Sequence, residues 1–356
     1  MKALFLTREY PPHVYGGAGV VVDQLSRALS RRMTVEVRCF GERPSPPRPE
    51  TLAVRGYKAW ERLGAGGDGP RFAPALETLS IALAMARDPV DADVVHAHTW
   101  YADMAGFWIR MLYEVPLIVT LHSMEPLRPW KADQLGAGYA LSCWIEKTAV
   151  ESADRVIAVS AQMRDDILRH FSIDPAKTVV LHNGIDPEVF HRVEARDALD
   201  RLGVRAPYVL FVGRITEQKG IFHLLDAARF LPEGIQVVLC AAAADTPEIE
   251  ERLRCAVSEH PNFLWVHQMA ETPVVASAVG GILEVVEDGK TGILVPPGRP
   301  EELAAALLRI LENPGLGRAM GLAGRRRVEE RFSWASIAQR TEQVYRDAIQ
   351  EFKQSK

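Results

Sequence analysis

The sequence predicts an α/β protein built from two doubly wound, Rossmann-like parallel-sheet domains. Short apolar runs bounded by turn residues alternate with helical patterns, as in parallel sheets whose strands are buried on both faces. The order strand, glycine-containing loop, helix also occurs twice, at residues 3–29 and again at residues 208–231. Each repeat would open one domain, and we expect the two domains to face each other across a cleft.

In the first half, a strand at residues 3–7 is followed by a loop rich in proline and glycine and then by a helix. Further strands are predicted at residues 34–40, 93–98, 116–122, 155–160 and 178–182. Two segments rich in proline or glycine, 41–50 and 64–70, predict loops. Polar residues gather at the carboxyl ends of the strands, which is where open parallel sheets bind ligands. We therefore expect a first domain over residues 1–190 with a ligand site at that edge.

The second half predicts a domain over residues 191–330, followed by a helix over 331–356 that packs back toward the first domain. Strands are expected at residues 208–213, 236–240, 263–266, 273–277 and within 289–297, and helices at 221–231, 247–258, 301–311 and 334–351. One place breaks the pattern, because only six residues separate 263–266 from 273–277. Consecutive parallel strands need a crossover of roughly a dozen residues. Either one run is not a parallel strand, or a βα unit is absent.

Composition excludes several classes of protein. With 42 Lys and Arg against 46 Asp and Glu, the net charge of −4 gives no basic field for nucleic acid or an anionic membrane. No apolar stretch approaches the ~20 residues of a membrane span, and the run after Met1 is too short for a secretion signal. The four cysteines have no metal-ligand spacing. We expect a reduced, cytoplasmic protein.

Two loops carry groups that suit a phosphate. Gly16 and Gly17 separate the first strand from its helix, where glycine allows close approach and the helix N-terminus presents unpaired N–H groups. A plain turn explains these glycines equally well. Arg214 and Lys219 flank the corresponding loop of the second half and could neutralise a departing diphosphate without a metal. Their place between a buried strand and a helix start favours this role over two solvated surface cations.

No metal site is predicted. His96 and His98 point to the same side of one strand, but no third ligand accompanies them at a suitable spacing. Asp91 and Asp93 precede that strand, at the edge away from the expected ligand face, and a solvated turn explains them better.

His122 closes a predicted strand and precedes the loop Glu125–Lys131, which combines charged, aromatic and proline residues. That setting favours a binding loop over a structural histidine.

These segments together resemble the retaining glycosyltransferases of family 4, which have the GT-B fold. They resemble most closely the actinobacterial-type glycogen synthases, whose close relatives make α-maltose 1-phosphate. The resemblance covers nearly the whole chain, and its motifs are Leu6–Pro12, Val14–Gly19, His96–Ala102, Glu125–Lys131, Ala158–Ser160, His182–Asp186, Gly213–Arg214, Lys219–Gly220 and Gly289–Gly292.

The resemblance implies a donor-side role for five residues. Gly16 and Gly17 would contact the donor diphosphate through their backbone N–H groups. Arg214 and Lys219 would stabilise the leaving nucleotide. His122 would bind the transferred glucose near its 6-hydroxyl, and it completes the implied catalytic set with Arg214 and Lys219.

The implied reaction transfers glucose from ADP-glucose into an α-1,4 bond with retention of configuration, without a cofactor. Arg128 and Lys131 would lie on the acceptor side, where they suit an acceptor that carries phosphate. The acceptor stays open between an α-glucan and glucose 1-phosphate, and so does the oligomeric state, with a homodimer as one arrangement.

The resemblance also implies an internal truncation of the second domain. The family's E-x7-E element, which serves the reacting sugar and the nucleotide ribose, should lie between Met269 and Glu271 and is absent there. About a helix, a strand and a second helix are missing, roughly 35 residues. Glu271 and Glu284 remain nearby, but we expect neither to substitute, because Glu271 precedes a strand and Glu284 falls in a glycine turn.

Two functions therefore stay open. The first is a hexosyltransferase of glycogen and α-glucan synthesis, with activity reduced or lost by the truncation. The second is an inactive protein that binds sugar nucleotide or glucan on the same scaffold. A sugar-phosphate isomerase of the epimerase type on related architecture is disfavoured, because the motifs follow the transferases.

Overall fold

The computed structural model describes residues 1–41, 49–60, 73–129, 131–132, 136–190, 196–213, 215, 219–241, 246–259, 262–266, 274–278 and 281–356. Its backbone contacts divide the chain into two compact units. The first unit comprises Met1–Ile185 and Glu330–Lys356, and the second comprises Asp186–Glu329. Of the loops expected from the sequence, residues 42–48 and 64–70 lie outside the described part of the chain.

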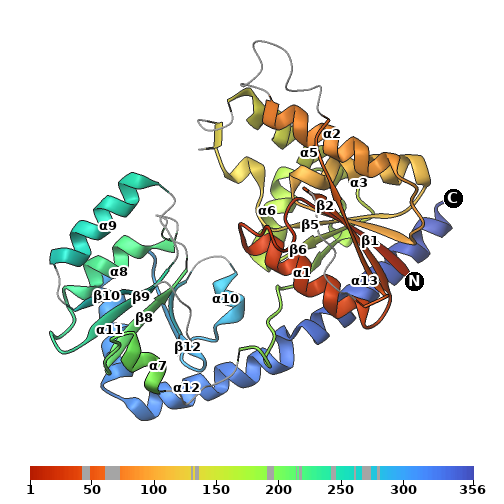
Figure 1. Cartoon of the computed structure of the whole chain (residues 1–356). Coiled ribbons are helices and arrows are strands. Elements are labelled where there is room, and N and C mark those ends of the chain that lie inside the picture. Colours follow the sequence, from red (N-terminus) through yellow and green to blue (C-terminus); the bar gives the residue numbers. More distant parts are fainter. Residues whose placement is uncertain are drawn as a thin grey trace. The chain divides into compact units, whose positions relative to one another are not determined.

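The first unit is built on a seven-stranded sheet in the order β3-β2-β1-β4-β5-β6-β7 (Figure 1). Its strands, all paired in parallel, are β1 (Lys2–Thr7), β2 (Thr34–Phe40), β3 (Leu52–Tyr57), β4 (Val94–His98), β5 (Leu117–Leu121), β6 (Arg155–Ala158) and β7 (Thr178–Val180). The strand order reverses between β1 and β4. In an open α/β sheet such a reversal marks the crevice where ligands bind, beyond the carboxyl ends of the two strands.

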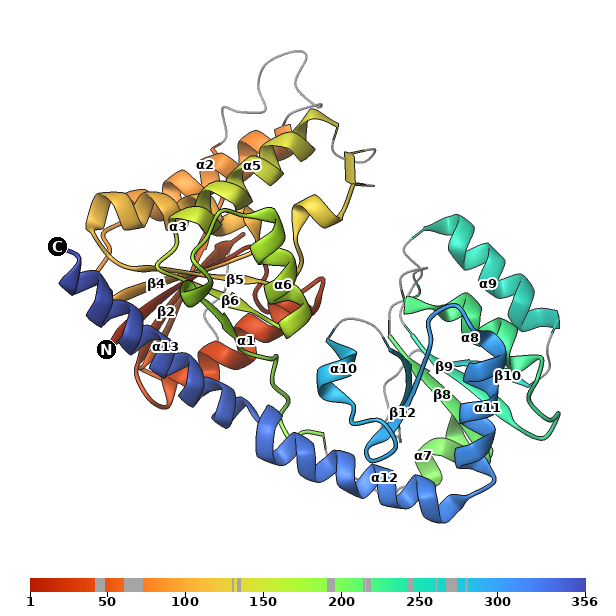
Figure 2. The ribbon, with the colours of Figure 1, turned by 180° about the vertical axis from the view of Figure 1, so that it is seen from behind.

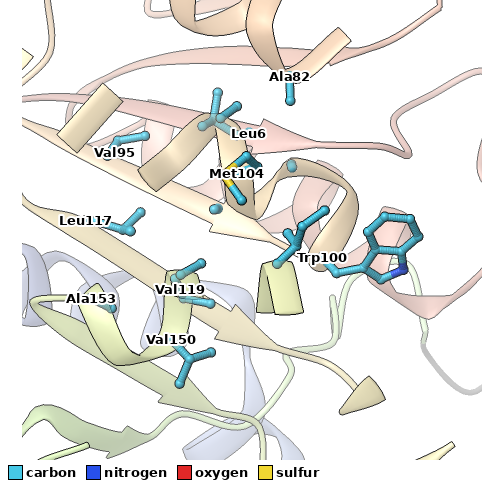
Figure 3. Close-up of a cluster of buried hydrophobic side chains, with 14 of the residues drawn as sticks. Leu6, Ala82, Val95, Trp100, Met104, Leu117, Val119, Val150 and Ala153 are labelled. Carbon is cyan, nitrogen blue, oxygen red and sulfur yellow. The ribbon is translucent and has the colours of Figure 1, made fainter. Parts of the chain in front are cut away.

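Helices cover both faces of this sheet (Figures 1 and 2). They are α1 (Gly17–Ser30), α2 (Ala73–Arg87), α3 (Trp100–Tyr113), α5 (Ala137–Ser152), α6 (Ala161–His170) and α13 (Trp334–Gln354). Side chains of α2, α3 and α5 form one buried apolar cluster with the sheet, and side chains of α1 and α13 form another on the opposite face. In Figure 3, Trp100 of the first cluster lies toward the carboxyl ends of the strands, whereas Val95 of β4 and Leu117 of β5 lie nearer the amino ends.

The last helix, α13, belongs to the first unit. The backbone N–H of Ile185 donates to the carbonyl of Phe332 at 2.7 Å, and the N–H of Trp334 donates back to Ile185 at 3.2 Å. Gly184 lies so close to Trp334 that an added Cβ would approach the indole to 2.6 Å. The chain thus returns to the first unit at the point where it left it.

The second unit contains two separate parallel sheets, in the orders β10-β9-β8 and β11-β12. The strands are β8 (Tyr208–Val212), β9 (Gln236–Cys240), β10 (Phe263–Val266), β11 (Val274–Ser277) and β12 (Gly292–Val295). A doubly wound sheet in the order 3-2-1-4-5-6 would have one further strand between β8 and β11. The two runs that the sequence places too close together for consecutive parallel strands are β10 and β11. Both are strands, but they lie in different sheets.

The helices of the second unit are α7 (Arg196–Arg201), α8 (Ile221–Ala228), α9 (Pro247–Glu259), α10 (Ile282–Val285), α11 (Pro300–Leu311) and α12 (Pro314–Arg327). A π-helical turn, Val328–Phe332, then leads into α13. Leu303 of α11 packs against the core of the three-stranded sheet and also against the core around Ile293 and Val295 of β12. This helix therefore joins the two sheets through their apolar faces.

Candidate functional site

The glycine loop follows β1 at the reversal point of the first sheet, where Thr7 pairs with His98 of β4. The backbone N–H groups of Tyr15 and Gly16 donate to one carboxylate oxygen of Glu9, at 2.9 and 2.8 Å. Gly17 begins α1 and is exposed. The loop therefore holds an anion, as expected at a helix N-terminus, and here the anion is the protein's own carboxylate.

Three histidines meet at the carboxyl ends of β4 and β5. His96 and His98 lie fully buried in β4, with ring centroids 4.1 Å apart. His96 is satisfied on both nitrogens, by the hydroxyls of Tyr345 and Thr120 at 2.6 Å each. The Nδ1 atom of His98 lies 3.1 Å from Nε2 of His122, the residue after β5. The structure thus brings the predicted sugar-binding histidine into a hydrogen bond with a second histidine.

Burial keeps this cluster neutral at pH 7. Desolvation lowers the pKa of His122 to about 4 and that of His96 to about 3. Burial, together with the two neighbouring rings, also lowers the pKa of His98 well below its ordinary value. A neutral imidazole has one donor and one acceptor nitrogen, so each ring can both accept and donate a hydrogen bond.

The turn from β4 into α3 is strained next to these histidines. Thr99 adopts φ of 68° and ψ of 152° at the start of α3. That conformation is unusual for a β-branched residue and costs on the order of 1–3 kcal/mol. Strain of this kind is typical of ligand sites.

The loop after His122 is organised around Glu125, which is buried. One oxygen of its carboxylate accepts from Nζ of Lys131 at 2.6 Å, and the other accepts from the hydroxyl of Ser142 at 2.9 Å. The backbone N–H of Glu125 donates to the carboxylate of Glu146 at 2.8 Å. Lys131, predicted to meet the acceptor, is therefore itself buried and paired with Glu125.

Arg128 has a more open position than Lys131. Its guanidinium lies 3.8 Å from the Glu125 carboxylate, and its side chain is 35% exposed. It also donates to the hydroxyl of Ser123 at 3.4 Å. Of the two predicted acceptor-side cations, Arg128 is the one with surface left for a ligand.

A buried carboxyl lies near this loop. Asp103 in the first turn of α3 is fully buried, and neither of its oxygens has a hydrogen-bond partner among the described residues. Burial and the neighbouring Glu125 raise the pKa of Asp103 to about 8, so it is mostly protonated at pH 7.

In the second unit, Lys219 lies exposed just before α8. Gly220 caps this helix with φ of 69°, a left-handed conformation that glycine adopts without strain. Arg214, the other predicted diphosphate ligand, lies outside the described residues.

Within the described residues, no group of three His, Cys, Asp or Glu side chains is placed to hold a metal ion. Asp93 accepts from the backbone N–H of Lys2 at 2.7 Å, and Asp91 lies 3.4 Å from its Nζ. Both aspartates therefore belong to the amino ends of the strands. The helices of the described part include none that is long and apolar enough to cross a membrane.

Sequence reasoning missed the roles of Glu9, Asp103 and Glu125. Glu9 falls within the motif Leu6–Pro12, but its contact depends on a loop conformation that brings the backbone of Tyr15 and Gly16 to its carboxylate. Asp103 falls just after the motif His96–Ala102, and a carboxyl in the first turn of a helix is ordinarily explained by its favourable interaction with the helix dipole. Only the packed structure reveals that it is buried.

Two family descriptions match the chain. Glycosyltransferase Family 4 matches residues 15–189, and Glycosyl transferases group 1 matches residues 268–327. The second match begins just after β10, so β8, β9 and β10 lie outside it.

Relatives match the chain over nearly its whole length. It is 42% identical to the alpha-maltose-1-phosphate synthase of Mycobacterium tuberculosis (strain CDC 1551 / Oshkosh), covering 97% of this chain and 99% of the relative. It is 27% identical to the glycogen synthase of the same strain, covering 97% and 94%. The first alignment spans 396 positions against 356 residues here, so at least 40 positions hold no residue of this chain.

Among solved structures, the sucrose-phosphate synthase of Thermosynechococcus elongatus matches with a TM-score of 0.77 at 24% identity, covering 98% of this chain and 99% of that one. This likeness confirms the predicted α/β fold of the GT-B type. The sequence relatives confirm the predicted family and its class of chemistry, hexosyl transfer. The chain belongs to glycosyltransferase family 4.

Proposed function

We propose that this chain is built as a retaining glucosyltransferase of α-glucan synthesis, with ADP-glucose as donor and an α-1,4 bond as product. The observation that supports this most is the 42% identity to alpha-maltose-1-phosphate synthase over nearly the full length of both chains. Maltose 1-phosphate is glucose joined to glucose 1-phosphate. Because identity to glycogen synthase is only 27%, we favour glucose 1-phosphate over glycogen as the acceptor.

The first unit would hold the transferred sugar and the acceptor. His122, neutral and hydrogen-bonded to His98, can donate to a hydroxyl oxygen of glucose. Arg128 keeps exposed surface beside the same loop and suits the phosphate of the acceptor.

The second unit would hold the nucleotide. Lys219 is exposed at the start of α8, where its ammonium group can reach a phosphate, and the helix N-terminus adds partial positive charge. With Arg214 it would supply the countercharge for the leaving diphosphate, so we propose that neither donor binding nor transfer needs a metal or cofactor.

A binding protein without turnover is the second candidate, favoured by the divided sheet of the second unit. Along the chain, the three-stranded sheet ends with β10 and the two-stranded sheet begins with β11. The two glutamates of the family's E-x7-E element should lie between these two strands. Loss of one oriented charge at a transition state typically costs ~10²–10³ in rate. We therefore propose that this chain retains nucleotide binding better than it retains transfer.

Calorimetric titration of ADP and ADP-glucose tests the donor site. Lys219→Ala and Arg214→Ala should each weaken binding by ~1.5–3 kcal/mol, the scale of a charge-assisted contact. Arg254→Ala, which removes an exposed cation from α9 of the same unit, should leave affinity unchanged. Unchanged affinity in both Lys219→Ala and Arg214→Ala would rule the site out.

The same titration after exhaustive EDTA treatment tests metal independence. Binding should survive the treatment. A loss restored by Mg²⁺ or Mn²⁺ would contradict the proposal and would return attention to Asp91 and Asp93.

A further inference from the structure

The hydrogen bond between His98 and His122 has a direction that the surrounding contacts decide. Nδ1 of His98 and Nε2 of His122 are 3.1 Å apart. Either His98 donates to His122, or His122 donates to His98. Because both rings are neutral, the choice fixes where each ring carries its proton.

The far nitrogen of His98 favours the first arrangement. Nε2 of His98 is buried and has no hydrogen-bond partner among the described residues. The ring packs against Phe5 and His96, whose centroids lie 5.3 and 4.1 Å away. If His98 accepted at Nδ1, its proton would sit on this Nε2 as a buried N–H without an acceptor, which is rare in folded proteins. If the proton of His98 is instead on Nδ1, the buried Nε2 carries only a lone pair without a donor.

His122 then has one possible tautomer. Its Nε2 accepts from His98, so its own proton lies on Nδ1. That nitrogen becomes the donor that His122 can offer to a ligand.

We propose that His98 is a positioning residue, which donates its Nδ1–H to His122 and holds His122 as a donor through Nδ1 for a hydroxyl oxygen of the transferred sugar. The ligand in this statement rests on the proposed function, whereas the tautomer rests on the contacts alone. Burial, which lowers the pKa of both rings, supports it by keeping either ring from gaining a second proton at pH 7. His96 does not share the role, because Thr120 and Tyr345 occupy both of its nitrogens.

The tautomer can be read from the imidazole ¹⁵N signals of the full chain labelled at histidine, with His122 assigned by loss of its signals in His122→Gln. We expect the neutral pattern with the proton on Nδ1. His98→Asn, whose amide places an N–H near the position of Nδ1, should keep it. In His98→Leu, His122 should no longer be held in this single tautomer. In His96→Gln, a buried change two residues away on the same strand, His122 should keep it.

Binding gives a second readout. The ratio of ADP-glucose to ADP affinity should fall about 3- to 10-fold in His98→Leu and recover in His98→Asn, the scale of one hydrogen bond. ADP affinity itself should not change, because His122 is proposed to contact the sugar.

A wild-type His122 with its proton on Nε2, or an unchanged His122 pattern in His98→Leu, would overturn the proposal. If His98→Leu does not fold, the wild-type spectrum still decides the direction of the bond. If the spectra agree with the proposal but ADP-glucose binds no better than ADP, the tautomer stands and the proposed function is at fault.

Discussion

The carboxylate of Glu9 and the backbone N–H of Gly16 form a 2.8 Å hydrogen bond inside the glycine loop. This places a negative charge where the sequence predicts a diphosphate contact. Gly19 is needed for the same approach, because an added Cβ there would lie 2.8 Å from Cβ of Glu9. An incoming phosphate must displace Glu9 from Gly16 or bind through Gly17 beside it.

Replacing Glu9 by glutamine should therefore tighten the binding of ADP. The amide oxygen can still accept hydrogen bonds from the backbone N–H groups of Tyr15 and Gly16. Because the amide carries no negative charge to repel a phosphate, ADP should bind about 1 kcal/mol, or about 5-fold, more tightly. Calorimetry at low and high salt measures the change, and the gain should shrink as salt screens the charge. Glu114→Gln, at an exposed carboxylate paired with Lys356, is the matched control. Weaker binding in Glu9→Gln would mean instead that Glu9 supports the loop.

Asp103 predicts a specific dependence of stability on pH. Its pKa of about 8 in the folded state lies above the value of 3.8 expected when it is unfolded and solvated. The folded state therefore holds a proton that the unfolded state releases. The contribution of this proton to the free energy of unfolding is fully present below about pH 4. It falls by about 1.4 kcal/mol per pH unit between about pH 4 and pH 8.

Asp103→Asn should remove this part of the pH dependence, because the amide is neutral throughout. Urea unfolding at pH 5, 6, 7 and 8 measures this dependence. The free energy of unfolding of Asp103→Asn should increase relative to that of the wild type as pH rises. Asp347→Asn, at an exposed position of α13, should follow the wild type. Parallel curves for Asp103→Asn and the wild type would contradict the prediction.

The two cations of the loop Glu125–Lys131 should respond differently to substitution by alanine. Arg128→Ala should weaken the binding of glucose 1-phosphate about 10-fold in the presence of ADP, because it removes a charge-assisted contact, while maltooligosaccharides bind as before. Lys131→Ala should instead lower stability by about 3–5 kcal/mol, since it removes the closest ion partner of the buried Glu125 carboxylate and leaves only the 3.8 Å pairing with Arg128. Displacement assays and urea unfolding separate the two effects. Binding of maltooligosaccharides without any binding of glucose 1-phosphate would favour glycogen as the acceptor.

Restoring the missing segment should raise both activity and stability. Inserting the corresponding residues of the 42% identical relative between β10 and β11 would supply a strand between β8 and β11 and return the acidic pair. We expect ADP-glucose turnover to rise ~10²–10³-fold, with a higher unfolding temperature for the second unit. A glycine-serine insert of equal length is the control. Equal turnover in the restored and original chains would show that the divided sheet does not limit transfer.

The strands of the first unit were predictable because buried parallel strands appear in the sequence as apolar runs. β3 was missed because Arg55 and Gly56 interrupt it at the edge of the sheet. Helices α2 and α3 were missed because apolar residues occur around much of their circumference, so the helical period is weak.

The candidate site was predictable as a set of residues but not as a set of contacts. The expectation that polar groups meet at the carboxyl edge held for His98 and His122, which lie on neighbouring strands. The pairing of Lys131 with Glu125 depends on the path of the loop and leaves no mark in residue spacing. Composition likewise carries no signal that Asp103 is buried.

The backbone bonds between Ile185 and the segment at Phe332 and Trp334 make the second unit an insertion into the first. Both of its connections leave from one point, where the two segments are already paired. Insertions with adjoining ends can be altered or removed without opening the host domain. Damage at the divided sheet would therefore remain confined, leaving the histidine cluster and the glycine loop on an intact scaffold.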